Sequence, residues 1–526
     1  MDATPHAAPL WQRSATQLAS GAAAGDFSIT EVIDQFAQRI EQVNPQINAV
    51  VYSLLNSARE TAQRLDQAGR PHCPGLLYGV PITIKECFYV QGVPATIGLT
   101  RHQQSLASHD GDLVRRLREA GAIPLGVTNV PQLMLLHETD NPVYGRTNNP
   151  WQLDHGVGGS SGGEAAIIAA GGSPLGLGSD LGGSIRLPAH FCGIHGLKPT
   201  NRRIARTGAF ANLRGMQGVE YQAGPLARHV EDLELAMRVL TNAPYRWHGG
   251  DGACRQFGNC EETDLAQLRI GYWEDDGYFR AAPAIRRVVR QSVAALQASG
   301  AQLIALQPPD VPSALRHYFT LVSADGGADF RQLLQGSRKA PEVARLVRLA
   351  QTPRWLRPLL AALMRMRGER KLADLFAAAG PRSAQSLWQA TAAAQQFVSE
   401  IFQTWDDAQL DAVITPPHAL PAFLHGAAVD LMPTASHAFL FNLLGVPCGA
   451  VACSRVADDE LSDRTELSDP VERSARRVEL ASTGMPIGVQ VAARPWREDH
   501  VLAIMSRLEK HFRNSDDYPH LARLPL

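Results

Sequence analysis

The sequence predicts an α/β fold in one large domain, and three observations support this prediction. The stretch "VPITIKE" alternates apolar side chains at Val80, Ile82 and Ile84, and "AIPLGVTNV" at 122–130 is a short apolar run beside turn residues, so both are typical of strands. Between them, residues 113–120 repeat apolar side chains at helical spacing, and strands that alternate with helices indicate an α/β sheet. The third observation is that 526 residues, 45% of them hydrophobic, can build a substantial core.

We expect a single domain over 1–526, and changes in apolar spacing, glycine content and charge along the chain divide it into successive parts. Residues 1–75 are expected to open with helices, because the sequence from Ser28 to Glu31 can cap a segment whose apolar residues recur at helical spacing. Residues 76–243 hold the predicted strands and the glycine-rich motifs, and 244–265 form a polar, glycine-rich loop. We expect 266–405 to be a largely helical excursion and 406–526 to return to the core, with a solvated, charged stretch at 455–475.

The net charge and the cysteines of the chain indicate which partners and which cellular compartment to expect. The chain has 50 basic and 51 acidic residues, a net charge of -1, so nothing electrostatic indicates a nucleic-acid partner. Seven scattered cysteines lack the paired spacings of a disulfide framework or a metal site, which favours a reducing compartment and no metal. Neither a signal peptide nor an apolar run of roughly 18 residues is present. We therefore expect a cytoplasmic protein that is not integral to a membrane.

Two glycine-rich segments carry serines that could be nucleophiles. Residues 158–162, "GGSSG", fit the nucleophile-elbow pattern G-x-S-x-G, but that motif needs a strand directly before the serine, and the preceding stretch has the composition of a loop. Residues 181–184, "LGGS", follow a predicted strand and offer successive backbone N–H groups that can bind an oxyanion, although glycine also serves merely tight turns. A phosphate-binding loop is disfavoured because no G-x-x-x-x-G-K-[ST] motif occurs.

Several motifs together resemble one enzyme family. They are "ITIKECF" at 82–88, "TNVPQLM" at 128–134, "GGSSGGEAA" at 158–166, "GLGSDLGGSIRLPAHFCGIHGLKPT" at 176–200 and "GMPIGVQVAARPW" at 484–496. This set resembles the amidase signature family, and within it the fatty acid amide hydrolase branch. The resemblance implies the amidase signature fold, a single α/β domain with a twisted mixed β-sheet flanked by helices. It implies no cofactor.

The resemblance also implies a Ser-cisSer-Lys triad, which falls on Ser184 as nucleophile, Ser160 as bridging serine and Lys85 as base. Lysine normally titrates near 10.4, so Lys85 must be buried to act as a neutral base near pH 7. The N–H groups of Leu181, Gly182, Gly183 and Ser184 would hold the oxyanion. Ser161, Asp180 and Arg186 would be supporting residues, and Asp180 and Arg186 would hold the turn by charge-assisted hydrogen bonds.

The branch further implies an apolar acyl channel, with Met134 and Leu135 near its inner end. The leading hypothesis is a serine amidase that cleaves N-acyl or primary amides with long apolar acyl groups through an acyl-enzyme on Ser184. Alternatives are the A subunit of a glutamyl-tRNA amidotransferase, a hydrolase of small amides, aryl amides or carbamates, and a binding protein that uses the amidase fold. The expected partner is a small-molecule amide substrate.

One segment outside the motifs suggests a membrane surface. Residues 352–376 place five apolar side chains at helical spacing and carry six basic against two acidic residues, a net charge of +4. A basic amphipathic helix can lie on an anionic bilayer, whereas an ordinary helix would turn the same apolar face to the core. Because the segment lies where fatty acid amide hydrolases carry a membrane-binding cap, we expect a peripheral membrane or substrate cap at 352–376. The sequence also leaves a homodimer open.

Overall fold

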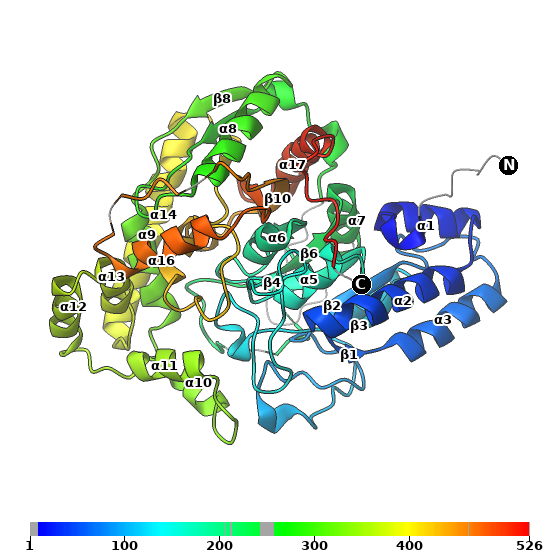
Figure 1. Cartoon of the computed structure of the whole chain (residues 1–526), viewed down its shortest axis with the longest axis horizontal. Coiled ribbons are helices and arrows are strands. Elements are labelled where there is room, and N and C mark those ends of the chain that lie inside the picture. Colours follow the sequence, from blue (N-terminus) through cyan, green and yellow to red (C-terminus); the bar gives the residue numbers. More distant parts are fainter. Residues whose placement is uncertain are drawn as a thin grey trace.

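The computed structural model describes residues 9–205, 207–210, 213–241, 257–460, 462–465 and 467–524, so most of the predicted loop 244–265 lies outside the described residues. Within them, one mixed sheet runs through the molecule in the order β1-β3-β2-β4-β6-β5-β10-β11-β9-β7-β8. Helices surround this sheet (Figure 1). The predicted α/β class with a mixed sheet flanked by helices is confirmed.

The first part of the chain forms helices against one edge of the sheet. Its elements are α1 (Ala15–Ala24), α2 (Ile29–Ile47), β1 (Val50–Ser53) and α3 (Leu55–Ala68). The predicted cap is present, since Ser28 Oγ accepts a hydrogen bond from the N–H of Glu31 at 3.0 Å at the start of α2. Apolar residues of α2, among them Phe36 and Ile40, are buried, which anchors this helix to the core.

The predicted strands occupy the centre of the sheet. This region contains β2 (Pro81–Lys85), α4 (Asp112–Glu119), β3 (Ile123–Thr128), α5 (Gly162–Ala169), β4 (Leu175–Asp180), α6 (Arg186–Cys192), β5 (His195–Lys198), β6 (Gln222–Ala227) and α7 (Val230–Thr241). β2 lies between β3 and β4 and runs parallel to both. All residues of these three strands are buried, as expected for parallel strands covered on both faces. Their carboxyl ends therefore meet at one edge.

The second half of the chain differs from its prediction in two places. The stretch expected to be largely helical, 266–405, also contains β7 (Arg269–Tyr272) and β8 (Gln302–Ala305), which pair in parallel and extend the sheet. Its helices are α8 (Pro283–Gln297), α9 (Val311–Val322), α10 (Ala328–Leu333), α11 (Pro341–Ala350), α12 (Arg357–Met366), α13 (Arg370–Ala378) and α14 (Ala384–Asp407). The stretch 455–475 is not wholly solvated either, because Arg464 is buried and pairs with Glu472 and Glu479.

The C-terminal part completes the sheet and its covering helices. Its elements are β9 (Ala412–Thr415), the short 3₁₀ helix η6 (Met432–Ala435), α15 (Ser436–Leu444), β10 (Cys448–Arg455), α16 (Pro470–Leu480), β11 (Pro486–Ala493) and α17 (Glu498–Phe512). β10 and β11 pair antiparallel, and β10 also pairs antiparallel with β5. These contacts join both halves of the chain in one sheet.

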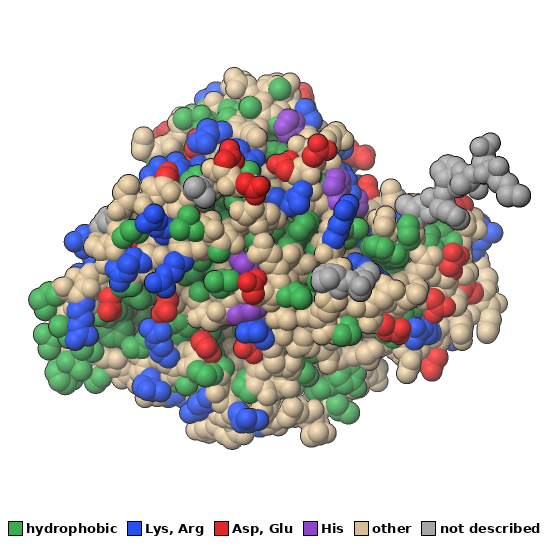
Figure 2. Space-filling model, in the orientation of Figure 1, with side chains coloured by type: hydrophobic (Ala, Val, Ile, Leu, Met, Phe, Trp, Pro, Cys, Tyr) green, Lys and Arg blue, Asp and Glu red, His purple; other side chains and the backbone are tan. Residues whose placement is uncertain are grey.

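The segment 352–376 forms two helices, where the sequence suggested one. Helix α12 ends before Gly368, which adopts φ +84° and allows the chain to turn into α13. Part of the apolar surface of this segment faces solvent, since Trp355 is 78% exposed, Leu359 65% and Met366 78%, whereas Leu375 of α13 is buried in the core. Figure 2 shows hydrophobic side chains gathered at the end of the molecule where Figure 1 draws α12. No described helix is long and apolar enough to cross a membrane.

Candidate active site

The predicted base and the glycine-rich turn 181–184 lie at the carboxyl ends of neighbouring parallel strands. Lys85 is the last residue of β2 and Asp180 the last of β4, and the register pairs Ile84 with Leu177. In open α/β sheets, ligands bind in the crevice outside the carboxyl ends of the strands. The topology thus brings Lys85 beside the turn that carries Ser184.

Lys85 is fully buried and surrounded by hydroxyl groups. Its Nζ donates to Ser160 Oγ at 2.7 Å, to Ser179 Oγ at 2.9 Å and to Ser161 Oγ at 3.0 Å. Burial lowers the pKa of Lys85 to about 8, because the charged ammonium loses its hydration. The sequence prediction placed Ser160 beside Lys85 and gave Ser161 only as a supporting residue. It missed Ser179 as a contact, although this residue lies next to the last position of β4, the strand that neighbours β2.

Ser160 and Ser161 stand between a loop and helix α5. The peptide bond between Gly159 and Ser160 is cis, as the resemblance implied. No strand directly precedes Ser160 in the described chain, so the elbow pattern at 158–162 is fortuitous. The N–H of Ser161 donates to the carbonyl oxygen of Ser184 at 3.1 Å, which joins the two glycine-rich segments next to both predicted serines.

A buried ion pair holds the turn 181–184. Arg186 Nε donates to Asp180 Oδ2 at 3.0 Å, and both side chains are completely buried. The same carboxylate accepts from the N–H of Gly183 at 2.7 Å and of Ile185 at 3.1 Å. Arg186 holds the pKa of Asp180 far below its usual range, so the carboxylate stays charged even though burial opposes this.

The hydrogen bond from Gly183 changes the predicted oxyanion hole. Because its N–H is directed at Asp180, Gly183 is not a free donor to a substrate in this structure. The N–H groups of Leu181, Gly182 and Ser184 have no protein acceptor within the described chain. Three of the four predicted donors therefore remain available. Gly183 adopts φ +97°, and a Cβ there would lie 1.8 Å from Leu187 Cδ1, so the turn requires glycine at this position.

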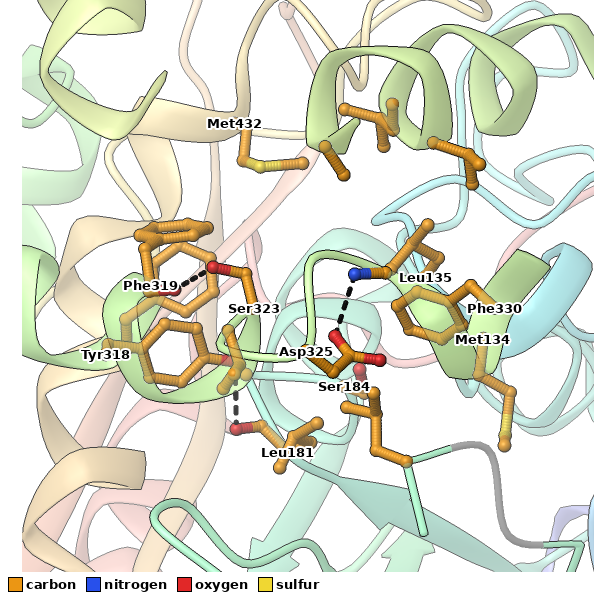
Figure 3. Close-up of a pocket in the computed structure, with 18 of the residues that line it drawn as sticks. Met134, Leu135, Leu181, Ser184, Tyr318, Phe319, Ser323, Asp325, Phe330 and Met432 are labelled. Atoms are coloured by element: carbon orange, nitrogen blue, oxygen red, sulfur yellow. Dashed lines mark hydrogen bonds between the residues drawn. The ribbon is translucent and has the colours of Figure 1, made fainter. Parts of the chain in front are cut away.

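Ser184 opens onto an apolar cavity of about 210 Å³. Figure 3 shows Ser184 between Tyr318 and Phe319 on one side and Met134 and Phe330 on the other. Met134 and Leu135, the predicted substrate-binding residues, both line this cavity. Further apolar lining comes from α11 and the C-terminal part, at Leu346, Val347, Ala350, Met432 and Phe439. Such a pocket can bury the hydrocarbon part of a ligand beside the serine.

Sequence reasoning missed His137 in the wall of the same cavity. Its Nε2 lies 3.0 Å from the carbonyl oxygen of Gly182, and burial lowers the pKa of His137 to about 4. The imidazole is therefore neutral at pH 7, so Nε2 carries the proton that bonds to Gly182. No motif in the sequence signalled this histidine, because only the fold brings it to the turn.

Glu164 is a second missed group, although it stands inside the "GGSSGGEAA" motif. It is fully buried and accepts from Thr83 Oγ1 at 2.6 Å and from Thr128 Oγ1 at 2.8 Å. Burial raises the pKa of Glu164 to about 8, so most of this carboxyl is protonated at pH 7 and does little to hold Lys85 charged. An acidic residue in an otherwise apolar, glycine-rich helix was the available signal.

The arrangement suits acyl transfer by a serine. It combines a hydroxyl that faces a cavity, a neighbouring serine bonded to a buried lysine, and backbone donors at the same turn. Within the described residues, no group of three or more His, Cys, Asp and Glu side chains could hold a metal ion.

Comparisons with known proteins agree with this chemistry. The model of the family described as Amidase matches residues 31–502. "Fatty-acid amide hydrolase 1" of Sus scrofa is 35% identical over 94% of this chain and 85% of its own length. "Fatty acid amide hydrolase 1" of Caenorhabditis elegans is 32% identical over 92% of this chain and 86% of its own length.

A solved structure gives the same result for the fold. The structure titled "Fatty acid amide hydrolase" superposes with a TM-score of 0.81 at 25% identity, over 97% of this chain and 86% of that one. The sequence resemblance is thereby confirmed, and the chain belongs to the amidase family.

Proposed function

We propose that this protein is a serine amidase that hydrolyses the C–N bond of amides with apolar acyl chains. The observation that carries the proposal is the contact between the buried Lys85 and Ser160 beside Ser184, which opens onto an apolar cavity. The proposal also draws on the names of the two relatives, which are both fatty acid amide hydrolases. Tyr318, Phe319 and Phe330 would enclose the acyl chain.

In the proposed reaction, neutral Lys85 accepts a proton from Ser160, and Ser160 accepts one from Ser184 as the Ser184 oxygen attacks the amide carbonyl. The N–H groups of Leu181, Gly182 and Ser184 stabilise the oxyanion of the tetrahedral intermediate. The proton then passes back through Ser160 to the leaving amine, and the C–N bond breaks. Water attacks the resulting acyl-enzyme and releases the carboxylic acid and free Ser184.

The roles of the remaining residues follow from their contacts. Asp180, paired with Arg186, would keep the turn in shape, because its carboxylate accepts from the N–H of Gly183 inside the turn and of Ile185 directly after it. Ser161 would fix the position of Lys85 relative to the Ser184 backbone, because its hydroxyl accepts from Lys85 and its N–H donates to the Ser184 carbonyl. His137, bonded to the Gly182 carbonyl, would orient the neighbouring donors.

The substrate class can be tested with a series of primary amides from acetamide to oleamide, with glutamine included and Ser184→Ala as the blank. Each methylene buried in the cavity should raise kcat/KM by up to about four-fold, from about 0.8 kcal/mol per methylene. A flat series with retained activity would favour a hydrolase of small amides, aryl amides or carbamates. Preference for glutamine, with co-purifying subunits, would favour the amidotransferase alternative, and failure of a fluorophosphonate to label Ser184 would favour the binding protein.

We further propose that the protein works in the cytoplasm, peripherally at a membrane surface. The exposed apolar side chains of α12 and the net charge of the surrounding segment support membrane contact. The six described cysteines are free thiols, which suits a reducing compartment.

Light scattering on the purified chain tests the homodimer that the sequence left open.

A further inference from the structure

A second cavity, of about 280 Å³, lies along helices α12 and α13 and the chain that follows them. It shares no lining residue with the cavity at Ser184. Four arginines line it, Arg354, Arg357, Arg365 and Arg382, and its other walls consist of alanine and proline. A hollow with four cationic side chains and no acidic one in its lining has the charge of an anion site.

Arg357 provides a fixed charge in this cavity. Its side chain is buried, and its three nitrogens donate to backbone carbonyls at 2.8 to 3.1 Å, those of Leu349, Ala350, Thr352, Phe376 and Ala379. These bonds close the ends of α11 and α13, where helix carbonyls lack partners. Arg357 thus has no donor to spare, although its charge still acts on the cavity.

Arg354 and Arg382 do have free donors. Arg382 Nη2 donates to the Ala378 carbonyl at 2.8 Å, but its Nε is buried and meets no partner in the described structure. Arg354 forms neither a hydrogen bond nor an ion pair with any described residue. A buried N–H group without an acceptor costs free energy. A bound ligand that accepts a hydrogen bond from Arg382 Nε would remove this cost.

The charges of the cluster are largely uncompensated. Arg365 pairs with Asp374 at 2.8 Å, whereas the other three arginines have no carboxylate partner among the described residues. Burial, followed by the charge of Arg354, lowers the pKa of Arg382, and burial, followed by the charge of Arg382, lowers that of Arg357. The arginines therefore repel one another, and a bound anion would relieve this repulsion.

We propose that this cavity binds a phosphate group. Guanidinium groups bind phosphate through paired hydrogen bonds, and Arg354, Arg365 and Arg382 offer such groups around a hollow of suitable size. Helix α12 lines the cavity and also presents the exposed Leu359 and Met366, so the headgroup of an anionic phospholipid could enter while its chains contact that apolar face. The lipid source rests on the membrane contact proposed above, whereas a site for free phosphate does not.

The lipid source is tested by sedimentation with phosphatidylcholine vesicles, with and without phosphatidic acid, at fixed ionic strength. Phosphatidic acid should increase the affinity of the wild type for the vesicles. Each arginine that Arg354→Gln/Arg382→Gln removes should reduce this gain in affinity by about five-fold. Arg64→Gln, which removes an arginine charge from the exposed side of α3, should behave like the wild type. An undiminished increase in the double variant overturns the assignment to this cavity.

Free phosphate is tested by thermal unfolding in phosphate and in chloride at equal ionic strength. The wild type should gain stability in phosphate, and the double variant should gain less. Arg354→Gln alone should also reduce the gain, and its folding is not at risk because Arg354 has no described partner. Stabilisation by phosphate without any effect of phosphatidic acid would show that free phosphate is the ligand, and absence of both effects overturns the proposal.

The same measurements separate this proposal from membrane contact itself. If wild-type protein does not bind vesicles of either composition, the membrane proposal fails, and the phosphate titration still decides about the cavity. If Arg354→Gln/Arg382→Gln binds phosphatidylcholine normally and loses only the response to phosphatidic acid, both proposals hold. Hydrolysis of a short, water-soluble amide should be unchanged in this variant, which serves as the control for folding.

Discussion

Lys85 Nζ and Ser160 Oγ lie 2.7 Å apart, although 75 residues separate them in the chain. No described carboxylate forms an ion pair with this lysine, and its nearest partners are the hydroxyl groups of three serines. An ammonium group in such surroundings is poorly solvated, which lowers the pKa of Lys85 to about 8. The pair therefore joins a base that can be neutral near physiological pH to a hydroxyl that can relay a proton.

The first prediction concerns pH. Lys85 acts as a base only when it is neutral, so kcat/KM should rise about ten-fold per unit as pH increases towards 8 and level off above it. The measurement is kcat/KM between pH 6 and 10 on one uncharged amide. Lys85→Ala should be slower by about 10²- to 10⁴-fold and should lose this limb. A limb that persists unchanged in Lys85→Ala would assign the titration to another group.

The two serines should differ in their reaction with a fluorophosphonate. Ser184→Ala should take up no label, because the nucleophile is gone, whereas Ser160→Ala should still be labelled, about 10²- to 10⁴-fold more slowly. Mass spectrometry of the labelled peptide locates the adduct. Ser173→Ala is the matched control, since among the described residues the Ser173 hydroxyl donates to the Leu175 carbonyl and not to any group of the site. An adduct on Ser160 would reverse the proposed roles.

A bulky side chain in the acyl cavity should impair long substrates selectively. Ala350 lines this cavity, so Ala350→Trp should occupy part of its volume and lower kcat/KM for oleamide at least ten-fold while leaving acetamide within about two-fold. Ala298→Trp, at the exposed end of α8, should change neither value. Equal losses for both amides would mean that the acyl chain lies elsewhere.

Membrane contact through α12 should depend on its exposed leucines. Leu359→Glu/Leu363→Glu places two charges on the apolar face and should abolish sedimentation with vesicles that contain anionic lipid. Because both side chains are exposed, the free energy of unfolding should change by less than about 1 kcal/mol. Urea unfolding provides that control, and equal sedimentation of variant and wild type would refute the contact.

The buried ion pair below the turn should be important for stability. Arg186→Met leaves the charge of Asp180 buried and uncompensated, so it should lower the free energy of unfolding by about 3 to 5 kcal/mol. Arg115→Met removes an arginine from an exposed ion pair with Glu119 and should cost less than about 1 kcal/mol. Urea unfolding of both variants makes the comparison. A similar small cost for the two would mean that Asp180 finds other compensation.

Features that depend on neighbours in the sequence were predictable. Apolar spacing predicted α2, β2, α4 and β3, because period and capping are local properties of the chain. The resemblance to the amidase signature family assigned roles to Lys85, Ser160 and Ser184, and the two serines stand in glycine-rich motifs that are visible in the sequence itself. The strands β7 and β8 were missed, because a strand of four residues gives too short an apolar pattern to be distinguished from its surroundings.

Features that depend on distant neighbours were decided by the tertiary structure. The sequence by itself determined the α/β class, the family motifs and the candidate nucleophile. Only the fold decided that Gly183 donates to Asp180, that His137 joins the cavity and that the apolar side of α12 faces outward. Each of these depends on which groups far apart in the chain become neighbours, and so on which donors are satisfied and which apolar surfaces are covered.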